Sequence, residues 1–331
     1  MREIAFIKKN KSKWLALEQS LSSKDKQNPD ELADSYIQLL NDLSFSQTYY
    51  PKSKTTIYLN SLVTQIYRKI YKTKRLERNR LKSFFLYEVP SLVYQYQKQL
   101  IFAFALFFFF TAIGALSAAF DERFVRIILG DNYVNMTLEN IKNGDPMAVY
   151  KRDGELNMFF GITINNIGVA IKSYIWGLSA GFLTFYASMQ NGIMLGSFQY
   201  FFYENGVFEE SIRGIWLHGA IEIFSIVIAT MAGFVLASSI LFPGTYSRFQ
   251  SFVTGARQSI KILISTLPFF VIAGFIEGFV TRYSNTMPLW LNVFIILITL
   301  SFISFYYIAL PIINHKKQNY AGISTLQKTQ F

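Results

Sequence analysis

Residues 100–120 read LIFAFALFFFFTAIGALSAAF and contain no charged side chain. An α-helix needs about 20 consecutive apolar residues to cross the roughly 30 Å hydrocarbon core of a bilayer, so this stretch predicts a transmembrane helix. The composition of the whole chain agrees with that environment, because 51% of its 331 residues are hydrophobic and only 16% are charged. This composition argues against a pair of ordinary soluble domains.

The apolar residues after this stretch gather into further segments. We predict an all-α, polytopic membrane protein with about six transmembrane helices and a transmembrane domain over residues 100–314. The predicted spans are 100–120, 165–189, 193–203, 215–241, 262–280 and 289–312. The third span follows a turn at Gln190-Asn191-Gly192 and is short, so we expect it to thin the membrane locally or to be re-entrant. Six crossings place every markedly basic connection on one side of the membrane, as the positive-inside rule requires.

The segment before the spans predicts a basic helical region in the cytoplasm, over residues 1–82. Asn28-Pro29-Asp30-Glu31 indicates a helix start, and three short amphipathic helices are expected to form a small bundle. Residues 83–99, broken by Pro90, predict an interfacial amphipathic helix. The N-terminus has no apolar stretch long enough for a signal peptide, so this region is expected in the cytoplasm, and six crossings place the tail 315–331 on the same side.

The net charge of +11 is concentrated before the first span. Residues 1–99 hold 18 Lys or Arg and 9 Asp or Glu, a balance of +9. Basic residues near a span hold it on the cytoplasmic side and attract anionic lipid headgroups, which is our interpretation here. A nucleic-acid or acidic-partner site is the alternative, and we predict that the chain binds no nucleic acid. The densest stretch contains Arg68, Lys69, Lys72, Lys74, Arg75, Arg78, Arg80 and Lys82.

The segment from 121 to 158 has the opposite balance, with seven acidic and five basic residues. It is therefore predicted to be an extracytoplasmic loop. The chain contains no cysteine, which excludes disulfides and thiolate metal sites.

A polar side chain within a predicted span is costly and requires a partner or a function, and we single out six such residues. This intramembrane polar cluster consists of Asn165, Asn166, Lys172, His218, Glu222 and Glu277. With six crossings, all six residues lie in the outer half of the membrane. His218 and Glu222 are four residues apart and therefore share one helix face.

Three interpretations of this cluster are open. In the first, Lys172 pairs with a glutamate and the asparagines satisfy backbone groups, so that the cluster determines helix packing. In the second, it is a ligand-binding or proton-linked site. In the third, His218, Glu222 and Glu277 bind a metal ion. The segment from His218 to Glu222 differs from the His-Glu-x-x-His signature of zinc peptidases.

Three pairs of glycines have the small-xxx-small spacing that allows helices to approach closely. The pairs are Gly177 with Gly181, Gly192 with Gly196, and Gly274 with Gly278. We interpret them as packing surfaces, either within the chain or between subunits.

Several motifs occur in a consistent order along the chain. They are Phe6-Ile7 with Trp14 and Leu17, the helix start Pro29-Asp30-Glu31-Leu32, the stretch from Lys142 to Tyr150, Asn165-Asn166, Asn191-Gly192 with Gly196, the segment from His218 to Glu222, and Ile276-Glu277-Gly278-Phe279. With these motifs, the chain resembles the stage II sporulation protein M family of bacterial membrane proteins over nearly its whole length.

The resemblance implies a multi-pass inner-membrane protein. In spore formers it implies membership of a complex of cell-wall-degrading enzymes that drives engulfment. Relatives in bacteria that form no spores are often encoded near a MoxR-type ATPase and RDD-family membrane proteins. The resemblance supplies no catalytic residue to carry over.

We therefore expect a non-enzymatic scaffold or complex subunit in the bacterial cell envelope, located in the inner membrane and without a cofactor. The expected partners are anionic lipid headgroups and other membrane or envelope proteins, with an RDD-family protein and a second copy of the chain as candidates. The first alternative is a transporter or channel subunit that uses the polar cluster. The second alternative is an intramembrane metal-dependent hydrolase.

Overall fold

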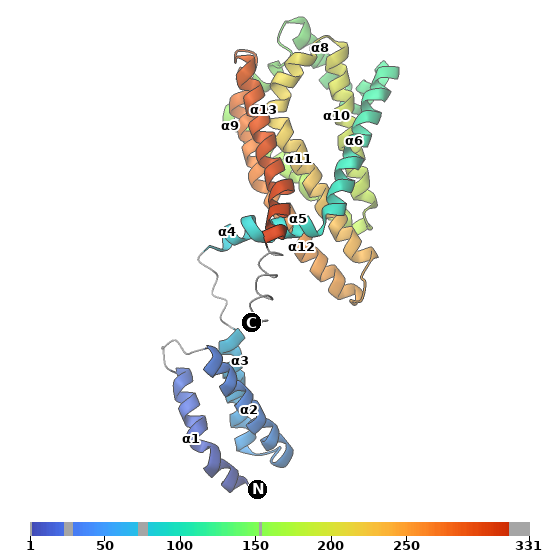
Figure 1. The fold of residues 1–331 in the computed structure, drawn as a ribbon. Helices are drawn as coiled ribbons and strands as arrows, with labels where there is room; N and C mark the ends of the chain where they lie inside the picture. Colours follow the sequence, from blue (N-terminus) through green and yellow to red (C-terminus); the bar gives the residue numbers. More distant parts are fainter. Residues whose placement is uncertain (1, 23–28, 72–78, 152–153, 318–331) are drawn as a thin grey trace. The chain divides into compact units, whose positions relative to one another are not determined.

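The computed structural model describes residues 2–22, 29–71, 79–151 and 154–317. Within these residues every regular element is a helix, which confirms the predicted all-α class (Figure 1). The chain divides into two compact units, of which the first ends at Arg80 and the second begins at Leu81. Each unit has a hydrophobic cluster of its own.

The first unit contains α1 (Glu3–Ser22), α2 (Pro29–Tyr49) and α3 (Lys54–Tyr71). α2 begins at Pro29, where the sequence predicts a helix start, because proline is tolerated in the first helical turn. Trp14 joins α1 to α2, since its Nε1 donates a 2.9 Å hydrogen bond to Asp42. The buried hydrophobic residues shared by the three helices are Phe6, Trp14, Leu39, Leu43, Leu59, Leu62, Val63 and Ile66.

The second unit begins within α4 (Arg80–Ser83) and continues with a π-helical turn (Phe84–Glu88) and α5 (Val89–Gln95). Pro90 lies where the π-helical turn passes into α5 without a break in the helix, so its missing N–H leaves a carbonyl of that turn without a helical donor. Later residues hold this segment in place: Lys261 Nζ lies 2.8 Å from Glu88 Oε2, and Asn314 donates to the Leu86 carbonyl at 2.6 Å.

Among the residues that the structure describes, four helices of the second unit are long and apolar enough to cross a membrane, which points to a membrane protein. They are α6 (Gln97–Phe120), α11 (Phe208–Leu241), α12 (Arg248–Phe275, continued as helix to Tyr283) and α13 (Leu289–Ser304, continued as helix to Lys317). α11 forms the core, because 72% of its most apolar window is buried inside the chain, against 28% for α6 and 17% for α13.

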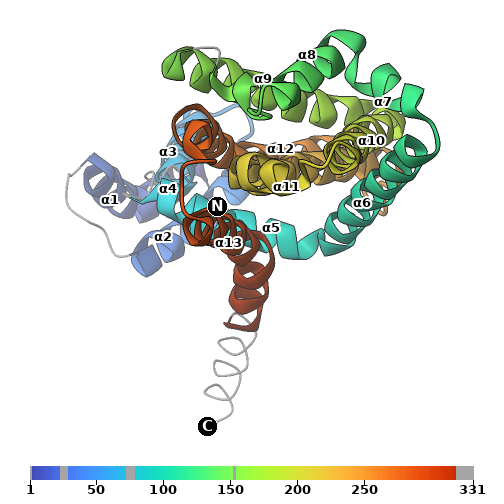
Figure 2. The same cartoon turned by 90° about the horizontal axis from the view of Figure 1, so that it is seen from above.

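Two further helices, α9 (Glu155–Ile175) and α10 (Phe182–Glu204), correct the predicted spans 165–189 and 193–203. The chain reverses between them at residues 176–181 rather than at the predicted turn. Ala180 and Gly181 have φ angles of 57° and 91° there. Glycine adopts this left-handed backbone without steric cost, which makes the reversal tight. α11 packs against α6, α9, α10, α12 and α13 (Figure 2).

The predicted turn at Gln190-Asn191-Gly192 is wrong, because these three residues lie in the middle of the helix α10. Asn191 donates a 2.8 Å hydrogen bond to the Ala187 carbonyl, so its amide is satisfied within the helix. Gly192 lies against the backbone of Phe107 on α6. The short third span is therefore the second half of a 23-residue helix. Neither α9 nor α10 is among the four helices that are long and apolar enough to cross a membrane. The total of six membrane crossings, which needs both of them, therefore stays a prediction.

The segment predicted as an extracytoplasmic loop is also largely helical. It contains α7 (Glu122–Leu129), α8 (Asp131–Lys142) and the first residues of α9. Gly130, with a φ of 85°, separates α7 from α8. Val125 and Val134 join a buried cluster with Phe201 and Phe202 of α10. These helices are short and amphipathic, so no long apolar run marks them in the sequence.

Candidate functional site

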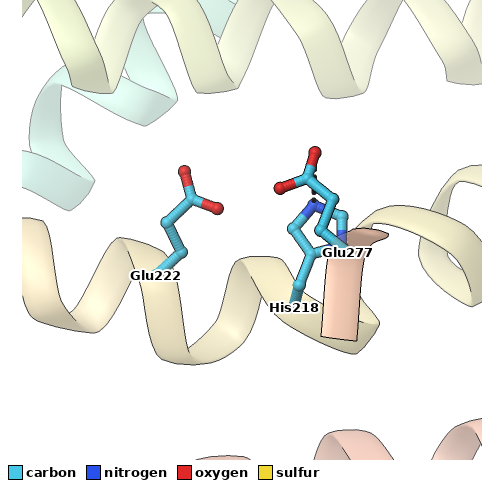
Figure 3. Close-up of side chains that lie close together, drawn as sticks. All are labelled: His218, Glu222 and Glu277. Carbon is cyan, nitrogen blue, oxygen red and sulfur yellow. Dashed lines mark ion pairs between the residues drawn. The ribbon is translucent and has the colours of Figure 1, made fainter. Parts of the chain in front are cut away.

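Three residues of the predicted polar cluster converge between α11 and the end of α12 (Figure 3). His218 and Glu222 lie one turn apart on α11, and Glu277 lies on the π-helical turn Ile276–Val280 that follows α12. One ligand atom from each side chain lies within 4.8 Å of the other two. Figure 3 shows both carboxylates on the same side of α11, with the imidazole beside Glu277.

Both ring nitrogens of His218 face polar groups. Nδ1 lies 3.1 Å from the hydroxyl of Thr281, and Nε2 lies 3.5 Å from Oε1 of Glu277. Thr281 donates its own proton to the Ile276 carbonyl at 3.3 Å. Glu277 and Thr281 are four residues apart, so the helical segment after α12 presents both toward the imidazole. π-helical turns of this kind are frequent at functional sites.

A cavity of about 530 Å³ opens beside these three residues. His218 and Glu277 are buried, whereas Glu222 is half-buried and lines the cavity. Asn166 on α9 lines the cavity beside the Glu222 carboxylate. The other amides that line the cavity are those of Asn165 and Asn191.

Tyr133 of α8 lines the same cavity, together with Ile128 and Leu129 from the end of α7. Burial raises the pKa of Tyr133 to about 12, so its hydroxyl stays neutral at physiological pH. The segment predicted as an outer loop therefore contributes an uncharged wall. The acidic lining residues are Glu222 and Glu277.

Lys172 lies apart from the other predicted residues. Its Nζ lies 4.4 Å from the ring centre of Trp176, in a separate cavity that Gln190 and Asn191 also line. Lys172 lies six positions after Asn166, a rotation of about 240° around a helix, so the two side chains leave α9 from different faces. The predicted pairing of Lys172 with a glutamate is therefore wrong, and Asn165, Asn166, His218, Glu222 and Glu277 line the cavity without it.

Thr281, Asn191 and Tyr133 belong to this site but were not predicted from the sequence. For Thr281 a signal exists, because its spacing of four residues from Glu277 repeats the spacing of His218 and Glu222. Asn191 was assigned to a turn. Tyr133 lies far from every apolar run, so only the packing of α8 brings it to the cavity.

The six glycines of the predicted packing pairs each lie against another segment of this chain. Gly177 lies against Gly233, Gly181 against Ala237, Gly192 against Phe107, Gly196 against Thr111, Gly274 against Thr163, and Gly278 against Glu155. These close approaches connect α10 to α6, the reversal to α11, and the end of α12 to α9. The geometry favours packing within the chain for all three pairs.

The predicted basic stretch is described in part. Arg68 and Lys69 lie near the end of α3, and Arg80 and Lys82 lie in α4. Lys72, Lys74, Arg75 and Arg78 lie outside the described residues. Binding of lipid headgroups by this stretch stays a prediction.

Residues 103–282 match the family model described as Stage II sporulation protein M. The match covers 180 of the 331 residues, more than half of the chain. The chain belongs to the stage II sporulation protein M family. The matched part includes every residue that lines the cavity, so the site lies within the stage II sporulation protein M domain.

Residues 4–72 match a second family model, Domain of unknown function (DUF8413). The two matches fall on the two compact units, with the stage II sporulation protein M match in the second. No curated protein and no solved structure matches the chain.

Proposed function

We propose that the chain is a non-enzymatic scaffold, a subunit of a membrane protein complex in the bacterial cell envelope. Membership of the stage II sporulation protein M family carries this proposal. The resemblance described above implies that relatives in spore formers work within a complex of cell-wall-degrading enzymes. In this proposal the chain lies in the inner membrane with both termini in the cytoplasm, and the first unit serves as a cytoplasmic docking module.

The outward surface of α13 supports this role. The exposed fractions of Phe294, Leu297 and Ile298 are 55%, 56% and 52%, and only 17% of the apolar window of this helix is buried within the chain. α6 has a similar outward surface, to which Ile101 and Phe109 contribute. In a bilayer, such surfaces contact either lipid or the helices of other membrane proteins. We infer that one of them holds an envelope protein.

Site-specific photo-crosslinking in native membranes tests this proposal. A photoreactive amino acid replaces Leu297 on α13 in one variant and Ile101 on α6 in a matched variant, because both residues are exposed and both helices are apolar. We expect one of the two positions to give a discrete adduct with an envelope protein, and reciprocal purification of that protein should recover this chain. Adducts with lipid alone at both positions would contradict the scaffold role.

The cavity favours a second candidate function, a transporter or channel subunit. The cavity has a volume of about 530 Å³ and is lined by two carboxylates. Ionisable residues inside a membrane domain often mark ion pathways, which favours this function. The test is cation or proton flux into liposomes that contain the purified chain. Flux that stays unchanged when Glu222 and Glu277 are both replaced by Gln would rule out this function.

A further inference from the structure

We propose that His218, Glu222 and Glu277 bind one divalent transition-metal ion of the Zn²⁺ class, with an open coordination position toward the cavity. The three groups come from two helices and supply one imidazole nitrogen and two carboxylate oxygens. The scaffold role neither requires nor predicts such a site, so each of the two proposals can be tested without the other.

The hydrogen bonds around His218 determine which ring nitrogen carries the proton. Thr281 donates its hydroxyl proton to the Ile276 carbonyl, so its oxygen is left to accept a hydrogen bond. Nδ1 of His218, 3.1 Å away, therefore carries the ring proton and donates it to Thr281. Nε2 then directs its lone pair toward Glu277, 3.5 Å away.

A lone pair and a carboxylate oxygen at that distance repel each other unless a proton or a cation lies between them. One proton can join only two acceptors, such as Nε2 and Glu277. Here a third acceptor, Glu222, lies within the same 4.8 Å group. A divalent cation at the centre satisfies all three groups at once and neutralises two carboxylates in an apolar domain, where uncompensated charge is costly.

The donor set selects the class of metal. One imidazole and two carboxylates match the nitrogen and oxygen ligands of Zn²⁺, whereas Ca²⁺ and Mg²⁺ prefer ligand sets made of oxygen alone. Zn²⁺ binds such ligands at about 2.0–2.2 Å, which separates tetrahedral ligands by roughly 3.4 Å. The ligand atoms spread over 4.8 Å, so the flexible side chains of Glu222 and Glu277 have to rotate inward on binding.

Outer partners orient two of the three ligands. The Thr281 hydroxyl lies 3.1 Å from Nδ1 of His218, and the Asn166 amide lies beside the carboxylate of Glu222. Metal-binding histidines and carboxylates commonly have such partners, which orient the ligand and raise its basicity. Three protein ligands leave a tetrahedral ion with a free position, and the half-buried Glu222 places that position beside the cavity of about 530 Å³.

The test uses the full chain, purified in mild detergent through a tag that contains no histidine. The chain is stripped with a chelator, equilibrated with Zn²⁺ and desalted, and its zinc content is measured by mass spectrometry. We expect one zinc ion per chain in the wild type. His218→Gln, Glu222→Gln and Glu277→Gln should each lower the affinity by about tenfold or more.

Two matched variants control for indirect effects. His315 is the only other histidine and stacks on Tyr94, and Glu155 pairs with Arg282 at 3.3 Å. His315→Gln and Glu155→Gln should therefore bind zinc as the wild type does. For the positioning residue, Thr281→Val should lower zinc affinity by about 10–100-fold, and Thr281→Ser should restore it.

X-ray absorption of the bound metal keeps the proposal testable if the ligand variants fail to fold. The His315→Gln chain should show nitrogen and oxygen ligands with the scattering pattern of one imidazole, which can then come only from His218. Three results would each overturn the proposal: no zinc in the wild type, wild-type affinity in folded His218→Gln, or no imidazole signal. In the first case, protons alone join the three groups.

Discussion

Glu3 connects the start of α1 to the residues where α3 begins. Its carboxylate accepts hydrogen bonds from the hydroxyls of Ser53 and Thr55, the latter at 2.8 Å. These two bonds hold the pKa of Glu3 below its usual value of 4.5. Because the folded pKa lies below the unfolded one, the interaction stabilises the fold above the unfolded pKa and is lost as pH falls through the folded pKa.

We expect acid to loosen α1 in the full chain. Amide hydrogen exchange of α1, corrected for the intrinsic rate, should become faster between about pH 5 and pH 3. Glu3→Gln should remove most of this pH dependence, because it removes the titrating group. Glu31→Gln, an exposed substitution on α2, should leave the pH dependence intact. An unchanged acid response in Glu3→Gln would show that another group controls α1.

Thr184 closes the reversal between α9 and α10. Its buried hydroxyl donates a 2.8 Å hydrogen bond to the carbonyl of Ser173, in the last turn of α9, where carbonyls lack helical partners. Thr184→Val keeps the shape of the side chain and removes the donor. We expect it to lower the free energy of unfolding by about 0.6–2 kcal/mol, measured by titration with a denaturing detergent. Thr184→Ser should retain the hydrogen bond, and equal stability of the Val variant and the wild type would contradict the prediction.

At the level of elements, α6 and α10 approach each other through glycine. A side chain at Gly196 would meet the backbone carbonyl of Thr111, which cannot move without displacing α6. We expect Gly196→Val to destabilise the chain by about 1–3 kcal/mol, measured by thermal unfolding in detergent.

Gly168 on α9 provides the matched control for this prediction. A side chain there has no other atom within 4 Å, so Gly168→Ala should be neutral or should stabilise the helix by up to about 1 kcal/mol. Equal melting temperatures for Gly196→Val and the wild type would mean that α6 and α10 can separate at little cost.

The elements also show where sequence patterns stop being informative. α11 is apolar on nearly every face and 34 residues long, so hydropathy alone locates it. α10 contains Gln190, Asn191 and Gly192, which are typical of turns in soluble proteins. Here the Asn191 side chain donates a hydrogen bond within its own helix, and Gly192 has no side chain, so that α6 can pack closely against α10. A pattern that ends a helix in water can continue one inside a packed membrane domain.

At the level of the whole molecule, the orientation in the membrane follows from charge. The balance of +9 in residues 1–99 predicts that this region stays in the cytoplasm. Because the chain has no cysteine, single cysteines introduced for labelling have no background.

We expect an impermeant thiol reagent, applied to intact cells, to label cysteines at Lys142 and Glu204. Cysteines at Ser12, Leu178 and Tyr246 should react only after the membrane is made permeable. All five residues are exposed, so access depends on the side of the membrane. Labelling of the Leu178 position from outside would show that α9 and α10 do not cross, and that six crossings are wrong.

The sequence by itself determined the class of the protein and its family, and it located five of the polar residues that line the cavity. Hydropathy is a sum over neighbouring residues, so the runs at 100–120, 215–241 and 289–312 were visible without any contact. His218 and Glu222 were likewise assigned to one face, because four residues make about one helical turn.

Only the tertiary structure decided which polar residues meet. The rotation of an apolar helix about its own axis leaves almost no trace in its sequence, because every face carries similar residues. That rotation directs Asn166 into the cavity and Lys172 toward Trp176. The π-helical turn after α12 then brings Glu277 to His218, which no local pattern could specify.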